Sequence, residues 1–377
     1  MNTWRLAVLT LGVTEMADYL GLISEAEMKS LPNEHPLRGL AATESEVSAN
    51  TGLAAKMIAT KNPHWLRSLK PRLIDTTDRT NTSSALGEIR AYGALLETWM
   101  DVHPNPSVTG SSVSPEFEVE NGDGSVIVEV HSRQLGRDQA QAMSDHYKAL
   151  EAEHAANIQK AAADGRKGNV VTMGTLEVFP YGAPKPGKDG DTVATNSISR
   201  IASVKGEEHQ IDQSKPFVLW LDLQDEGVWG GLSLSAEDFS PLHTEMKEGH
   251  VGHGVVWFAL YGRKDDPLVL SKGYDYSSMP LAHEGRFNQV IGSGPSRVSA
   301  FVFSLPRATV LMENPDAIHP LPPRFRAGML KAPFFRLDLS FVNWEPGVVA
   351  DLIAVQRKAL FAAERALKSF DVDSLSS

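Results

Sequence analysis

The chain contains no cysteine, and this absence excludes disulfide bonds, thiolate zinc sites and cysteine nucleophiles. It also has no apolar run close to the about 20 residues that a membrane-spanning helix needs. The N-terminal run from Leu6 to Val13 follows a single basic residue and precedes an acidic segment, which is unlike a signal peptide. No G-x-S-x-G nucleophile elbow is present. We therefore expect a cytoplasmic protein that has no membrane segment and is not a serine hydrolase.

Basic residues are in the minority. The 36 lysines and arginines face 47 aspartates and glutamates, which gives a net charge of -11. This balance excludes a surface coated in positive charge for nucleic acid, but a local basic groove remains compatible with it, because attraction depends on where the charge lies.

The 377 residues, 42% of them hydrophobic, are enough for one large domain or two ordinary ones. The pattern predicts an α/β fold with a mixed sheet. We expect a mostly helical addition over 1–80, a core over 81–225 and a β and helical extension over 226–377 that packs on the core. Helices are expected over 83–99, 136–163, 196–211 and 346–370, a hairpin over 114–134, and strands at 169–179, 215–225, 254–263 and 299–304.

The predicted hairpin carries polar residues at strand positions where apolar residues would be sufficient for folding. In SVIVEVHS, Glu129 and His131 fall on the face opposite Val126, Val128 and Val130, because side chains alternate along a strand. In PEFEVE, Glu116 lies on the face opposite Phe117. The turn NGDG favours a tight connection, so pairing can bring Glu116 beside Glu129.

Two carboxylates and an imidazole on one face suit a divalent cation. Mg²⁺ prefers oxygen ligands and is usually held by one or two carboxylates together with water and substrate phosphate. A cation held in this way polarises a phosphodiester and lowers the pKa of an attacking water.

These residues resemble a family motif. Pro115-Glu116, twelve residues and then Glu129-Val130-His131 are similar to the PD-(D/E)xK motif of the restriction-endonuclease-like nucleases. The resemblance implies a mixed-sheet nuclease core, Mg²⁺ or Mn²⁺ held by Glu116 and Glu129, and nucleic acid, chiefly DNA, as the substrate. It also implies that Glu88 is the additional glutamate on the preceding helix. Lys205 and Gln210 then match a later helix that packs near the site.

Two positions depart from the motif. Glu116 stands where aspartate is usual, and His131 stands where the family has lysine. A neutral imidazole can act as a base near neutral pH, and Lys205 or Arg133 can supply the missing positive charge. The alternative readings are a catalytically inactive nuclease fold that binds nucleic acid or protein, and an unrelated α/β scaffold with incidental carboxylates. The oligomeric state is open.

Three histidines, His243, His250 and His253, lie close together in the sequence. The segment has no clear carboxylate helper for a zinc site. We interpret its glycines as shaping a turn before the expected strand at 254–263.

Overall fold

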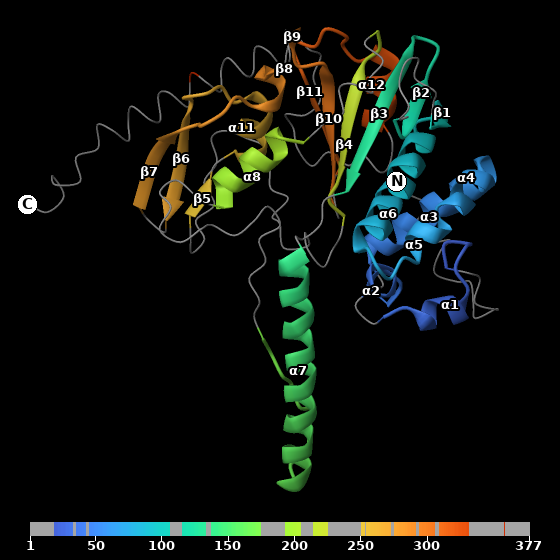
Figure 1. Cartoon of the computed structure of the whole chain (residues 1–377), viewed down its shortest axis with the longest axis vertical. Coiled ribbons are helices and arrows are strands. Elements are labelled where there is room, and N and C mark those ends of the chain that lie inside the picture. Colours follow the sequence, from blue (N-terminus) through green and yellow to red (C-terminus); the bar gives the residue numbers. More distant parts are fainter. Residues whose placement is uncertain are drawn as a thin grey trace, which may run out of the picture.

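The computed structural model (Figure 1) describes most of the chain between residues 19 and 331. The described ranges are 19–32, 35–42, 45–105, 115–132, 137–174, 193–204, 214–224, 250–252, 254–272, 275–291, 294–305 and 309–331, together with Lys358.

The helices and strands alternate along the chain, as an α/β protein requires. The helices are α1 (Glu25–Ser30), α2 (Pro36–Ala42), α3 (Glu46–Lys61), α4 (Pro63–Ser68), α5 (Lys70–Leu73), α6 (Arg79–Glu97), α7 (Arg137–Ala163), α8 (Val193–Ala202), α11 (Val255–Tyr261) and α12 (Pro323–Lys331), with a 3-10 turn η1 (Arg286–Asn288). The strands are β1 (Asp101–Pro104), β2 (Phe117–Glu120), β3 (Ser125–Ser132), β4 (Phe217–Asp222), β5 (His250–Gly252), β6 (Pro267–Lys272), β7 (Asp275–Pro280), β8 (Val290–Ile291), β9 (Gly294–Pro295), β10 (Val298–Ser304) and β11 (Thr309–Glu313).

The central element is a mixed six-stranded sheet with the order β1-β2-β3-β4-β10-β11. Strands β1, β2 and β3 are antiparallel, β3, β4 and β10 run parallel, and β11 returns antiparallel to β10. The fold is therefore mixed α/β, as predicted. Two of the six strands come from beyond residue 225, a segment that the sequence pattern assigned to an extension packed on the core.

Helices cover both faces of this sheet, which explains why β4 is buried along its whole length. On one face α6 packs against β3 and β4, and an aromatic cluster of Trp65, Tyr92 and Phe117 fills the layer at centroid distances of 4.8 to 5.7 Å. On the other face α8 packs against α11, and Phe287 of η1 contacts Phe301 of β10 at 5.7 Å. Figure 1 shows α6 on one side of the sheet and α8 with α11 on the other.

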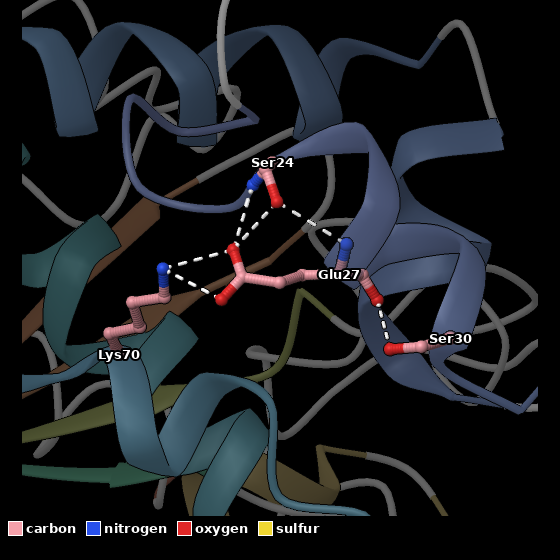
Figure 2. Close-up of polar contacts among 4 residues, drawn as sticks. All are labelled: Ser24, Glu27, Ser30 and Lys70. Atoms are coloured by element: carbon pink, nitrogen blue, oxygen red, sulfur yellow. Dashed lines mark hydrogen bonds and ion pairs between the residues drawn. The ribbon is translucent and has the colours of Figure 1, made fainter.

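The described part of the N-terminal region, up to residue 80, contains the helices α1 to α5 and the start of α6. Helix α1 begins with a capping box, in which the Ser24 hydroxyl accepts from the Glu27 amide at 3.3 Å and the Glu27 carboxylate accepts from the Ser24 amide at 3.0 Å. The same carboxylate binds Lys70 of α5 at 2.9 Å (Figure 2). These contacts connect α1 to the short helix that precedes α6.

Most of the described elements match their predicted positions. The hairpin, the strands at 215–225 and 299–304 and the helix at 136–163 are confirmed as β2 with β3, β4, β10 and α7. The helix expected over 83–99 is α6, which begins earlier, at Arg79, because the Asp78 carboxylate caps its first turn by accepting from the Thr80 amide at 2.8 Å.

Two predicted strands were wrong where the structure describes them. The segment expected as a strand at 254–263 is the helix α11, capped by Gly254 in the left-handed conformation (φ +62°). A short apolar run fits a buried strand or a buried helix equally well, and here it packs against α8. Residues 169–174 form neither helix nor strand; the Thr172 hydroxyl bonds His154 and Asn157 of α7 instead.

Several predictions fall outside the described residues. They concern Lys205, Gln210, Arg133, His243, His253 and, apart from Lys358, the helix expected over 346–370. Within the described ranges, no helix has both the length and the apolar character needed to cross a membrane.

Candidate metal and phosphate site

The β2–β3 hairpin forms because its turn residues accept unusual backbone angles. Gly122 and Gly124 have φ of +77° and +144°, and the Asn121 amide donates to the Gly124 carbonyl at 3.2 Å. The register pairs Phe117 with Val128. The next position along each strand is Glu116 on one side and Glu129 on the other, so the hairpin brings the two glutamates together as predicted.

Glu116 directly precedes β2 and is held by two hydrogen bonds of its side chain. Its carboxylate accepts a hydrogen bond from the Val130 backbone amide at 3.0 Å, which connects this side chain to β3. The side chain is also hydrogen-bonded to Glu129, which keeps only 9% of its accessible surface. A hydrogen bond between two carboxyl groups requires a proton on one of them. The position between the two carboxyl groups can therefore hold either a shared proton or a cation.

The electrostatics around Glu116 favour its neutral form. Burial raises the pKa of this carboxyl, and the negative charge of Glu88 raises it further, while the hydrogen bonds with Glu129 and the Val130 amide act in the opposite direction. Glu88 therefore lies close enough for its charge to act on Glu116. The carboxyl pair of Glu116 and Glu129 thus lies within electrostatic range of a third carboxyl, Glu88 of α6.

Glu88 is already paired. The Arg72 guanidinium donates from Nη1 to Oε2 at 3.0 Å and from Nη2 to Oε1 at 2.7 Å, in a two-bond fork. Such forks are among the strongest hydrogen-bonded ion pairs in proteins. Arg72 was not among the residues predicted from the sequence, although it is a cation only sixteen residues before Glu88.

Close packing of α6 sets the position of Glu88. The neighbouring Gly87 lies against the carboxyl ends of β3 and β4, where an added Cβ would lie 2.1 Å from the Ser132 hydroxyl oxygen and 3.1 Å from the Asp222 Cβ. A larger residue here would require the Ser132 side chain or the helix to move. Glu88 follows one position later on the same helix, where it pairs with Arg72.

A second polar cluster lies at the same ends of the parallel strands. Asp222, which ends β4, is 3% exposed and accepts from Arg90 at 2.8 Å, and Arg90 also donates to the Thr51 hydroxyl at 3.0 Å. The sequence analysis missed this ion pair too. The available signal was an aspartate directly after the apolar run FVLWL, because a buried carboxylate requires a partner.

The remaining predicted site residues are placed as follows. His131 lies on β3 opposite Leu221 of β4, on the same face as Glu129, and its Nε2 atom is buried. His250 lies in β5. The structure brings Glu116 and Glu129 together, the charge of Glu88 acts on Glu116, and His131 lies two positions along the same strand as Glu129.

The donor set fits a cation held mainly by the protein's two hairpin carboxyls. Within the described ranges, no group of three or more histidines, aspartates or glutamates is arranged to hold a metal ion. Magnesium sites commonly use only one or two carboxylates and complete their shell with water and substrate phosphate. Glu116 and Glu129 supply two carboxylates. The third, Glu88, is already hydrogen-bonded to Arg72.

Comparison with known proteins adds no relative, since no protein-family model, no curated protein and no solved structure matches the chain.

Proposed function

We propose that this protein is a nuclease that hydrolyses phosphodiester bonds of nucleic acid with Mg²⁺ or Mn²⁺. The observation that carries the proposal is the pair of Glu116, which is half-buried, and Glu129, which is 9% exposed; the two are hydrogen-bonded to each other, and the charge of Glu88 acts on Glu116. Burying adjacent carboxyls is costly unless a proton or a cation compensates them. DNA is the proposed substrate, following the resemblance of the motif. The cytoplasm is the proposed location.

The arrangement gives each residue a distinct task. Glu116 and Glu129 bind the cation, and the Val130 amide orients the Glu116 carboxylate toward it. The cation, when bound, polarises the phosphodiester and lowers the pKa of an attacking water. His131, on the face of β3 that carries Glu129, accepts the proton of that water where the family has lysine.

The arrangement of the sheet supports the resemblance to restriction-endonuclease-like proteins. A helix with a glutamate, α6, packs on an antiparallel hairpin that carries the two motif acids, and β4 then adds in parallel to β3. We propose that α6, β2, β3 and β4 make the nuclease-like core and that β10 and β11 widen its sheet.

A second candidate function is a nuclease fold that binds its partner without cleaving it. The observation in its favour is the pairing of Glu88 with Arg72, which leaves two carboxyls for the cation. A protein that only binds nucleic acid does not need to activate a water molecule. Histidine at position 131, where the family has lysine, is therefore compatible with this function.

The two functions are separated by a cleavage assay. Supercoiled plasmid, single-stranded DNA and RNA are each incubated with the purified chain in Mn²⁺, Mg²⁺ or EDTA. The nuclease proposal predicts cleavage that requires the cation and falls by at least about 100-fold in Glu129→Ala, because one of two ligands is removed.

Glu118→Ala is the matched control. Glu118 lies on the same strand two positions after Glu116, and it pairs with Lys215 rather than with the carboxyl cluster. The control should cleave like the wild type. If the wild type binds nucleic acid but does not cleave it at high protein concentration, the binding function stands and the nuclease proposal fails.

A further inference from the structure

Arg72 lies between the buried carboxyl cluster and solvent. Its side chain is 38% exposed, whereas that of its partner Glu88 is 11% exposed. The guanidinium therefore contacts a nearly buried carboxylate at one edge and water at another.

The bonds to Glu88 leave donors of Arg72 unused. A guanidinium has five N–H donors in one plane. The fork to Glu88 engages one from Nη1 and one from Nη2. No other acceptor in the described part of the chain binds the edge formed by Nε and the second Nη2 hydrogen, so this edge can bind a ligand. Two donors side by side on one edge match two oxygens of a phosphate group.

The backbone of Arg72 is anchored to the helix that carries Glu88. The Thr82 hydroxyl of α6 donates to the Arg72 carbonyl at 3.2 Å. At the end of the same segment, His35 contacts the Asp75 carbonyl at 3.1 Å through Nε2. Arg72 is therefore held at its main chain and at its side chain, which reduces the entropy lost when a ligand binds.

The other cation of α5 is directed elsewhere. Lys70, two residues before Arg72, binds the Glu27 carboxylate of the α1 capping box at 2.9 Å (Figure 2). Arg72 is thus the cation of α5 that pairs with the carboxyl cluster.

We propose that Arg72 is a phosphate-binding residue of this site, oriented by Glu88 and donating from its outer edge to a phosphate of nucleic acid bound at Glu116 and Glu129. This inference rests on the proposed function, since it assigns the positive group that the motif lacks at His131. Glu88 is then a positioning residue, and the pairing of Glu88 with Arg72 belongs to the assembled site.

The test measures binding separately from cleavage. Fluorescein-labelled 20-base-pair DNA and a 20-nucleotide RNA are titrated with the wild type, Arg72→Gln, Arg72→Lys and Lys70→Gln in Ca²⁺, and anisotropy is recorded from 50 to 200 mM salt. Lys70→Gln is the matched control, because it removes a paired cation from the same helix.

Loss of a phosphate contact has a defined signature. Arg72→Gln should weaken binding by at least tenfold and make the slope of log K against log salt shallower by about 0.7 to 0.9, which is the value for one phosphate contact. Arg72→Lys should keep the slope and lose part of the affinity, because lysine keeps the charge without the fork. Lys70→Gln should match the wild type, and melting curves report whether each variant is folded.

Three outcomes overturn the inference, and a fourth applies if Arg72→Gln does not fold. The first is an Arg72→Gln protein that binds with unchanged affinity and salt slope; if Glu129→Ala still abolishes cleavage, only the role of Arg72 falls. The second is an equal loss of affinity in Lys70→Gln, which reduces the effect to general charge. The third is a wild type that binds neither DNA nor RNA, which removes the proposed function together with the inference. If Arg72→Gln does not fold, the test uses the affinity of Arg72→Lys for DNA and RNA. An affinity of Arg72→Lys equal to that of the wild type would then contradict the inference.

Discussion

A Cβ atom added to Gly87 would lie 2.1 Å from the hydroxyl oxygen of Ser132. A glycine therefore sets how closely α6, the helix that carries Glu88, approaches β3, the strand that carries Glu129.

Gly87→Ala should therefore displace α6 from the sheet. We expect a loss of about 1 to 3 kcal/mol of unfolding free energy, the usual cost of forcing an additional methyl group into a packed interior, measured by urea denaturation. The Gly87→Ala/Ser132→Ala double variant removes the nearest clashing atom and should recover part of the loss. Equal stability of the single and double variants would show that Ser132 does not limit the approach.

The raised pKa of Glu116 predicts that the stability of the folded protein depends on pH. This pKa is raised above 4.5, so the folded chain holds this proton more strongly than the unfolded chain does. The resulting stabilisation is complete below 4.5 and is lost as the pH rises through the folded value. Glu116→Gln stays neutral, so its melting temperature should rise relative to the wild type between pH 4.5 and 8. A difference that does not change with pH would contradict this.

The ion pair of Arg90 and Asp222 is buried on both sides, at 7% and 3% exposure. Asp222→Ala leaves the guanidinium without its charge partner and should cost about 3 to 5 kcal/mol. Arg90→Met/Asp222→Leu removes both charges and should be closer to the wild type. Additive losses in the double variant, measured by denaturant unfolding, would exclude this coupling.

His131 has a role that kinetics can test. As a general base it should contribute about 100-fold or more to kcat, so His131→Ala should lose rate while its DNA affinity in Ca²⁺ stays near that of the wild type. The acidic limb of the pH–rate profile should also disappear. A profile unchanged in shape would assign the base to another group.

The hairpin was predictable because its information is local. Alternation over SVIVEVHS, the glycine turn and the acidic positions fix the faces of β2 and β3 and hence the meeting of Glu116 and Glu129. The apolar run VLWL likewise identified β4 as a buried strand.

The features that were not predicted depend on contacts between distant parts of the chain. No periodicity reveals that Arg72 meets Glu88 or that Arg90 meets Asp222, since these pairs form only after α5, α6 and β4 have packed. The VVWFALY run was misassigned because seven apolar residues fit either a strand or a helix, and its packing on α8 decided the outcome.

The most direct test of the account is a crystal of the wild type soaked in Mn²⁺, with anomalous diffraction recorded. The account predicts one peak about 2 Å from an oxygen of Glu116 and an oxygen of Glu129, with the hydrogen bond between the two carboxyls broken. The contradicting result is no peak at this position while Glu116 and Glu129 remain hydrogen-bonded to each other.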